Sequence, residues 1–194
     1  PEKQTMESID NIDDDSLKIF RRNIQMIFQD PYESLNPRWT IKDIIKEPLD
    51  IHNIGNLAER EDTIIEILRT VGLTPPENYL SRYPHEISGG QRQRVSIART
   101  LVMKPKFVIC DEPTSMLDVS IRISIMDLML NLAKELEVSY LYITHDLAVA
   151  RYMCNRIAVM FNGKIVEIAE TEELLQNPIP VSYTHLRAHE TAID

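Results

Sequence analysis

Two adjacent acids close an apolar stretch in the middle of the chain. Residues Phe107 to Cys110 are apolar, and Asp111, Glu112 and Pro113 follow directly. Such a stretch is typical of a buried strand, and open α/β sheets bind ligands at the carboxyl ends of their strands. In phosphoryl transfer one carboxylate can hold Mg²⁺ while a second orients the attacking water. These roles suit Asp111 and Glu112, and an acid pair at a helix start is the structural alternative.

A glycine pair stands before an arginine-rich helix upstream of these acids. Ser88, Gly89, Gly90 and Gln91 open a helix that we expect to end at Met103. Glycines let the backbone approach an anion, which the free N–H groups and partial positive charge of a helix N-terminus attract. The segment is therefore a candidate phosphate site. An ordinary serine-capped helix after a turn is the alternative.

These residues must be positioned by an alternation of strands and helices. The predicted elements are helix 16–22, strand 23–29, helices 41–49, 58–71 and 89–103, strand 106–111, helix 119–136, strand 138–144, helix 146–155, and a hairpin of strands 156–161 and 164–169. Residues 30–39 have the composition of a loop, and Pro48 and Gly72 are expected to end the two helices after it. The order predicts a mostly parallel α/β sheet with a helical insert.

The composition is that of a folded protein rather than one that coats nucleic acid. The chain has 194 residues, of which 43% are hydrophobic and 26% charged, and a formal net charge of -9. Nucleic-acid backbones require clustered Lys and Arg instead. Cys110 and Cys154 lack metal or redox spacing, so we interpret both as reduced structural thiols. No run approaches about eighteen apolar residues, and we expect a cytosolic type of protein.

Two further segments complete an ordered set of motifs. Residues 115–118 (SMLD) follow the acids, and residues 144–146 (THD) follow the next predicted strand. These two segments, together with Gln29 at a strand end, residues 88–94 (SGGQRQR) and residues 111–113 (DEP), resemble the ATP-binding cassette family. The resemblance covers about residues 16–178. Residues 28–38 and 83–100 most resemble the ATPase subunits of oligopeptide, dipeptide and nickel importers. This implies a P-loop NTPase-like sheet core, a partial domain over 1–180 and a helical subdomain at about 38–103.

The resemblance implies a role for each motif residue. Gln29 would touch Mg²⁺ and the water while sensing the membrane subunit. Asp111 would hold Mg²⁺, Glu112 would act as general base, and His145 would contact the γ-phosphate of ATP. On its own, His145 would be interpreted as a capping or core histidine, and its position after the other motifs reverses that interpretation. The aromatic loop residues Tyr32 and Trp39 are more typical of packing or of a partner contact than of base stacking.

The resemblance also implies a shared site. Residues 88–91 would bind the γ-phosphate of ATP held by the opposite subunit, and Asp118 would line the interface. The partners would be a second ATPase subunit, identical or not, and the membrane permease, with an extracytoplasmic solute-binding protein acting indirectly and no nucleic acid. The protein would lie peripherally on the cytoplasmic face of the membrane. MgATP hydrolysis there would drive the uptake of peptides or a related solute.

Two other function classes stay open from the sequence. One is a soluble ATPase of the same family that acts in repair or on the ribosome, although residues 29–88 contain neither heptads nor Cys. The other is a regulatory module that never hydrolyses ATP. The retained Glu112 and His145 argue against this second reading.

The sequence departs from the family pattern in three places. It contains no GxxxxGK[ST], the loop that cradles phosphates, so we expect a truncated ATPase that is inactive alone. Met116 stands where the family usually has Ala. After Pro178 the usual segment is replaced, and residues 181–194 resemble an adaptor-derived extension that we exclude from the fold. The pair His185 and His189 lacks a third ligand, so we propose no metal site there.

Overall fold

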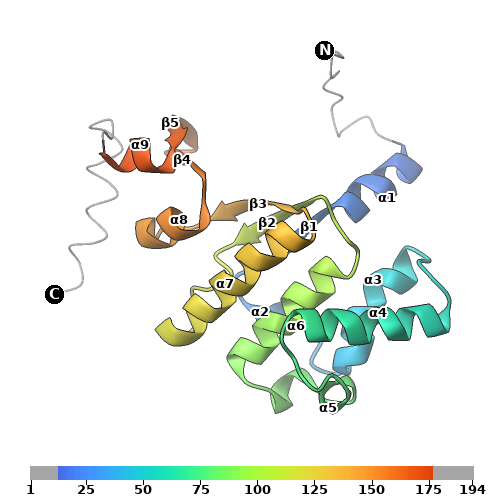
Figure 1. Cartoon of the computed structure of the whole chain (residues 1–194). Coiled ribbons are helices and arrows are strands. Elements are labelled where there is room, and N and C mark those ends of the chain that lie inside the picture. Colours follow the sequence, from blue (N-terminus) through green and yellow to red (C-terminus); the bar gives the residue numbers. More distant parts are fainter. Residues whose placement is uncertain (1–12, 177–194) are drawn as a thin grey trace. The chain divides into compact units, whose positions relative to one another are not determined.

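The computed structural model describes residues 13–176 (Figure 1), and within them residues 13–141 and 142–176 form two compact units. The first unit contains α1 (Asp14–Asn23), β1 (Ile24–Ile27), α2 (Pro31–Ser34), α3 (Ile41–Ile51), α4 (Leu57–Thr70), α5 (Glu77–Leu80), α6 (Gly89–Leu101), β2 (Phe107–Asp111) and α7 (Val119–Glu135). Strand β3 (Ser139–Ile143) crosses the boundary between the units. The second unit contains α8 (Leu147–Met153), β4 (Arg156–Phe161), β5 (Lys164–Glu170) and α9 (Thr171–Gln176).

A parallel sheet in the order β1-β2-β3 organises the first unit. Strands β1 and β2 pair in parallel from Ile24 opposite Phe107 to Ile27 opposite Cys110. The Ser139 N–H donates to the Lys106 carbonyl at 3.1 Å and holds the start of β3 beside β2. Helix α6 packs on β1, and α7 packs on α6. The predicted α/β fold with a parallel sheet is confirmed.

The helical insert is held by apolar stripes with helical spacing. Helix α3 buries Ile41, Ile44, Ile45 and Leu49, helix α4 buries Ile64, Ile67 and Leu68, and both pack against α6. Residues three and four apart lie on one face of a helix, so each sequence forms a single buried stripe. Asn56 caps α4 in a reciprocal arrangement with Glu59. The insert is thereby fixed to the helix that begins with the glycine pair.

Two local predictions in this region are wrong. Helix α3 does not end at Leu49, as predicted from Pro48, but continues to Ile51, because Pro48 lies in the last turn, where its missing N–H removes a single helical bond. The Pro48 carbonyl still accepts from the His52 N–H at 3.1 Å, and Leu49 is buried. The predicted loop contains α2, because Asp30 caps the Tyr32 N–H at 2.7 Å and proline suits a first helical position.

The second unit is a hairpin with two short helices. Strands β4 and β5 pair antiparallel around Asn162 and Gly163, whose φ angles of 48° and 74° fit the predicted tight turn. Helix α9 packs on both strands, and the Thr171 hydroxyl donates to the Cys154 carbonyl at 2.6 Å. The domain bounds 1–180 and 38–103 stay predictions. The tail 181–194, with His185 and His189, lies outside the described residues.

The start of α6 packs closely against α7. A Cβ built on the buried Gly90 would lie 2.7 Å from Ile121 Cγ2, which is closer than side chains pack. A Cβ on Gly89 would meet only ordinary contacts, the nearest being Leu117 Cδ2 at 3.8 Å. The first turn of α6 therefore needs the second glycine for its own packing and leaves space at the first.

We predict that Gly90→Ala destabilises the chain, because Ile121 must shift to admit the new methyl group. Overpacking of this kind costs about 1–3 kcal/mol. The measurement is urea unfolding of the two alanine variants, with Gly89→Ala as the matched control, expected to stay within about 0.5 kcal/mol of the parent chain. Equal unfolding midpoints for the two variants would contradict the packing argument.

Both cysteines are free thiols in protected surroundings. Cys110 is fully buried in β2, and burial raises the pKa of the Cys154 thiol above its usual value. The thiolate is the reactive form. We therefore expect both thiols to react with an aromatic disulfide at pH 7.5 at least about tenfold more slowly in the folded chain than in urea. Rapid labelling of the folded chain would show that Cys154 is not shielded.

Candidate functional site

The parallel register brings Gln29 and Glu112 to the same edge of the sheet. Gln29 lies two residues after Ile27, and Glu112 lies two residues after its partner Cys110. The Gln29 amide nitrogen donates to Glu112 Oε2 at 3.3 Å and to the Ser115 hydroxyl oxygen at 3.4 Å. Gln29 is exposed, and Glu112 is half-buried. The two predicted residues therefore meet in a cluster that solvent reaches from one side.

The turn after β2 holds Glu112 in an uncommon conformation. Asp111 is the last residue of β2, and Glu112 has a φ of 41°, in the left-handed region that a residue with a side chain seldom adopts. The Ser115 hydroxyl donates to the Glu112 carbonyl at 3.0 Å and closes the turn. Pro113 and Thr114 are buried beneath it. Backbone strain of this kind concentrates at functional sites.

The donor set at this edge suits Mg²⁺. Mg²⁺ prefers oxygen ligands and usually takes one or two from protein, with phosphate oxygens and waters completing an octahedron. The half-buried Asp111 carboxylate supplies one such ligand. Because the Gln29 amide nitrogen is turned towards Glu112 and Ser115, its oxygen is the atom left for a cation. Among residues 13–176, no three His, Cys, Asp or Glu side chains lie together in a group that could hold a metal ion.

Residues 88–91, which we call the glycine turn, form a capping box at the start of α6. The Ser88 hydroxyl oxygen accepts from the Gln91 N–H at 3.3 Å, and the Gln91 side-chain oxygen accepts from the Ser88 N–H at 3.0 Å. The N–H groups of Gly89 and Gly90 have no acceptor within the helix, as at every helix start. They sit where the helix dipole is positive. The Ser88 hydroxyl can also donate, so the predicted phosphate site offers up to three donors.

The side chain of Gln91 is committed to this turn. Besides the bond to Ser88, its amide nitrogen donates to the Tyr79 hydroxyl at 3.4 Å. Gln91 therefore holds Ser88 in place from within the chain, and its predicted contact with the γ-phosphate stays a prediction. The signal for this arrangement is the spacing Ser-x-x-Gln at a helix start.

Asp118 lies beside the glycine turn. It occupies the residue before α7, is exposed, and makes no capping bond with its side chain. Its neighbour Leu117 is the nearest contact of the Gly89 position, and Met116 and Val119 are exposed by 65% and 70%. The turn and the Asp118 loop thus form one surface, with apolar side chains uncovered on it.

His145 belongs to the second unit. It is exposed and stands directly before Asp146, whose side chain accepts from the N–H groups of Ala148 and Val149 and caps α8. The Asp146 N–H donates to the Thr144 hydroxyl oxygen at 3.1 Å. Asp146 is therefore the capping residue of this motif. The γ-phosphate role of His145 stays a prediction.

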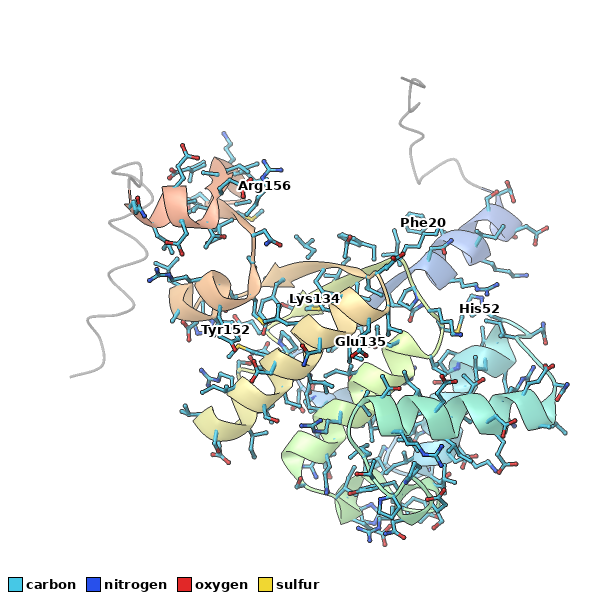
Figure 2. All side chains as sticks on the ribbon, viewed as in Figure 1. Phe20, His52, Lys134, Glu135, Tyr152 and Arg156 are labelled. Atoms are coloured by element: carbon cyan, nitrogen blue, oxygen red, sulfur yellow. The ribbon has the colours of Figure 1, made fainter. Side chains whose placement is uncertain are left out.

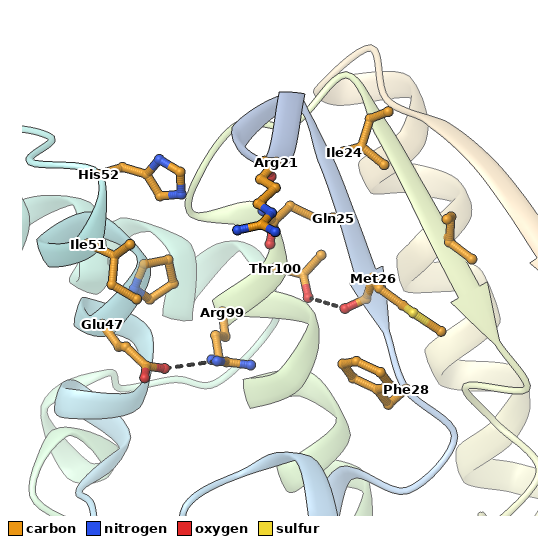
Figure 3. A pocket seen from close by; sticks show the side chains of 12 residues that line it. Arg21, Ile24, Gln25, Met26, Phe28, Glu47, Ile51, His52, Arg99 and Thr100 are labelled. Atoms are coloured by element: carbon orange, nitrogen blue, oxygen red, sulfur yellow. Dashed lines mark hydrogen bonds and ion pairs between the residues drawn. The ribbon is translucent and has the colours of Figure 1, made fainter. Parts of the chain in front are cut away.

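A cavity of about 440 Å³ adjoins the Gln29 segment in the first unit (Figure 3). Strand β1 supplies Ile24 and Met26, and Phe28 follows it, while α3 supplies Ile51 and His52 follows the end of that helix (Figure 3). On the wall, Arg99 of α6 pairs with Glu47 of α3 at 2.8 Å. The cavity is apolar within and charged at its rim. No periodic pattern in the sequence predicts this cavity, because its walls come from five separate elements: α1, β1, α3, α6 and β2.

The comparisons with known proteins agree with these motifs. A family model described as ABC transporter matches residues 2–115. The chain is 48% identical over 174 residues to the oligopeptide transport ATP-binding protein AppF of Bacillus subtilis, covering 89% of this chain and 52% of the relative. It is 55% identical to AmiF of Streptococcus pneumoniae, an oligopeptide transport ATP-binding protein, with coverages of 81% and 51%. The chain spans about half the length of the curated relatives it matches.

A solved structure gives the same result for the fold. The dimeric post-hydrolysis state of the ATP-binding cassette MJ0796, bound to ADP and Pi, superposes with a TM-score of 0.69 at 32% identity. The match covers 83% of this chain and 68% of that one. Gln29 meets Glu112 at the strand ends, and the glycine turn is capped, as the motifs predict. Together with the family model and these relatives, this shows that the chain belongs to the ABC transporter family.

Proposed function

We propose that this chain is a segment of the ATP-hydrolysing subunit of an importer for peptides or a related solute. The observation that carries the proposal is the Gln29, Glu112 and Ser115 cluster at the ends of paired parallel strands. The names of the relatives support the peptide class. Because the chain covers about half of them, the activity, the substrate and the partners all belong to this proposal.

The chemistry assigned to the cluster is attack of water on the γ-phosphorus of ATP, with cleavage of the bond to the bridging oxygen and release of ADP and phosphate. Glu112 accepts the proton of the water, and Gln29 keeps the Glu112 carboxylate turned towards the open side of the sheet. Asp111 and Gln29 would hold Mg²⁺, which would neutralise charge on the phosphates. His145 donates to the γ-phosphate. The 194 residues contain no GxxxxGK[ST], so the grip on the β- and γ-phosphates comes from sequence outside them.

The glycine turn is assigned to a second nucleotide, held by an opposite subunit. The Ser88 hydroxyl and the N–H groups of Gly89 and Gly90 are the donors assigned to this nucleotide, and Gln91 holds Ser88 through the capping bonds. Asp118 lines the interface, together with the exposed Met116 and Val119. Burying these side chains against the partner favours dimerisation, and ATP supplies the anion that the turn lacks.

The cavity next to Gln29 is assigned to a helix of the membrane permease. Phe28 is exposed by 47% and Ile51 by 67%, so a partner side chain can reach the apolar interior. Phe28 is adjacent to Gln29, so an occupant of the cavity pushes directly on the catalytic cluster. Within residues 13–176 no helix has the length and apolarity needed to cross a bilayer. We propose a peripheral position on the cytoplasmic face.

We predict that Glu112→Gln in the native-length ATPase lowers kcat by about 10²–10⁴-fold, because the water loses its proton acceptor. ATP binding stays within about twofold, since the amide has the same shape. The matched control is Glu135→Gln at the end of α7, an exposed acid far along the chain (Figure 2). Hydrolysis by Glu112→Gln at the parental rate would refute the assignment of the base.

The 194-residue chain alone is expected to show no ATP turnover above that of its own Glu112→Gln variant, because it lacks the phosphate-cradling loop. The measurement is release of phosphate from MgATP by the purified chain. Turnover that disappears in the variant would show that the chain grips ATP by other residues.

We expect Phe28→Ala in the assembled transporter to lower transport by at least about fivefold, because the cavity loses the aromatic ring that meets the permease. ATP hydrolysis by the same variant subunit, purified without the permease, should change by less than about twofold. Leu57→Ala is the control, since Leu57 is exposed by 74% and does not line the cavity. Equal transport by the two variants would move the permease contact elsewhere.

A further inference from the structure

Arg92 binds the backbone that leads into the glycine turn. From the first turns of α6 its Nη1 donates to the Ile87 carbonyl at 2.6 Å and to the Pro84 carbonyl at 3.3 Å. Ile87 directly precedes Ser88. A guanidinium bound to both carbonyls fixes the path of the chain as it enters the cap, so the direction of the Ser88 hydroxyl depends on Arg92.

The same guanidinium touches the segment after Gln29. Its carbon lies 5.5 Å from the centre of the Tyr32 ring, within the range of a cation–π interaction. Tyr32 is in α2, which packs against α6, and its N–H donates to the Asp30 carboxylate at 2.7 Å. Asp30 follows Gln29 directly. Arg92 therefore contacts α2 and the glycine turn at once.

Stability alone does not explain an arginine at this position. Its Nε is buried and has no hydrogen-bond partner among the described residues, and a buried donor without a partner lowers stability. A methionine would fill a similar volume without that cost. Unsatisfied polar groups of this kind in a folded protein call for a functional explanation.

We propose that Arg92 is a positioning residue that couples the Gln29 segment to the glycine turn. The proposal rests on the proposed function, in which that turn meets the ATP of the opposite subunit. Tyr32 holds the guanidinium from one side, and the two carbonyls hold it from the other. A displacement of α2, which follows Gln29, is then passed to Ser88 through one side chain.

The experiment compares Arg92→Met, Tyr32→Ala and the double variant in the native-length ATPase. We expect Arg92→Met to lower kcat by about tenfold, and Tyr32→Ala by about threefold to tenfold, in line with the loss of a partly desolvated cation–π contact. ATP affinity of the subunit purified without its partners should not change, because the turn acts on the partner's nucleotide. The Tm of Arg92→Met should not fall, because methionine removes the buried Nε that has no partner. Adding Tyr32→Ala to Arg92→Met should lower kcat by less than about twofold more.

Conservative and control variants separate positioning from simple structural damage. Tyr32→Phe keeps the ring and should restore kcat relative to Tyr32→Ala. Arg92→Lys keeps the charge but not the fork that reaches two carbonyls, so it should rescue only in part. Arg38→Met removes an exposed guanidinium from residues 30–39, the segment that contains Tyr32. This control variant should hydrolyse ATP at the parental rate.

A second measurement uses the 194-residue chain without nucleotide. Hydrogen exchange at the amides of Ser88 and Gln91 should be at least about tenfold faster in Arg92→Met and also faster in Tyr32→Ala. Unchanged hydrogen exchange would overturn the coupling, and so would single-variant effects on kcat that multiply in the double variant. In either case the Glu112→Gln variant would still test the proposed function separately. A parental ATPase without turnover would instead remove the proposed function, and with it the catalytic meaning of the coupling.

Discussion

The parallel pairing of β1 with β2 is the constraint on which the candidate site depends. Its register carries Gln29 and Glu112 to neighbouring positions past the strand ends, although 83 residues of chain separate them. A one-residue slip would turn each side chain to the other face of the sheet. The buried Ile27, Val108 and Cys110 prevent that slip, because they would be exposed by it. The geometry of the cluster is thus secured by the hydrophobic core beneath it.

Helix α6 serves packing and binding with different parts of its length. Its later turns bury Val95, Ile97, Ala98 and Leu101 against the insert and the sheet, and its first turn has N–H groups without an acceptor inside the helix. The two glycines divide these tasks. Gly90 permits close contact with Ile121, and Gly89 leaves room on the outer side. A site built at the end of a well-anchored helix keeps its geometry without help from the ligand.

Periodicity and motif order predicted most of the fold, because they depend on local sequence. The strand ending in Asp111, the cap at Ser88 and the hairpin at Asn162 all have local signals. Pro48 led to a predicted end of α3 that is too early, because burial of the adjacent Leu49 outweighs the tendency of proline to end a helix. The contacts of Arg92 with Tyr32 and Ile87 could not be predicted, since they depend on how α2 lies against α6. The engaged side chain of Gln91 had a signal in the capping-box spacing, but its bond to Tyr79 had none.

The left-handed backbone of Glu112 sets activity against stability at a single residue. Holding a residue with a side chain in that region costs about 1–2 kcal/mol, and glycine would avoid the cost. The most stable sequence for this turn is therefore one that lacks the carboxylate. Selection for thermal stability alone would tend to replace the group that we propose as the base for hydrolysis, and a stabilised variant of the protein should be checked at this position first.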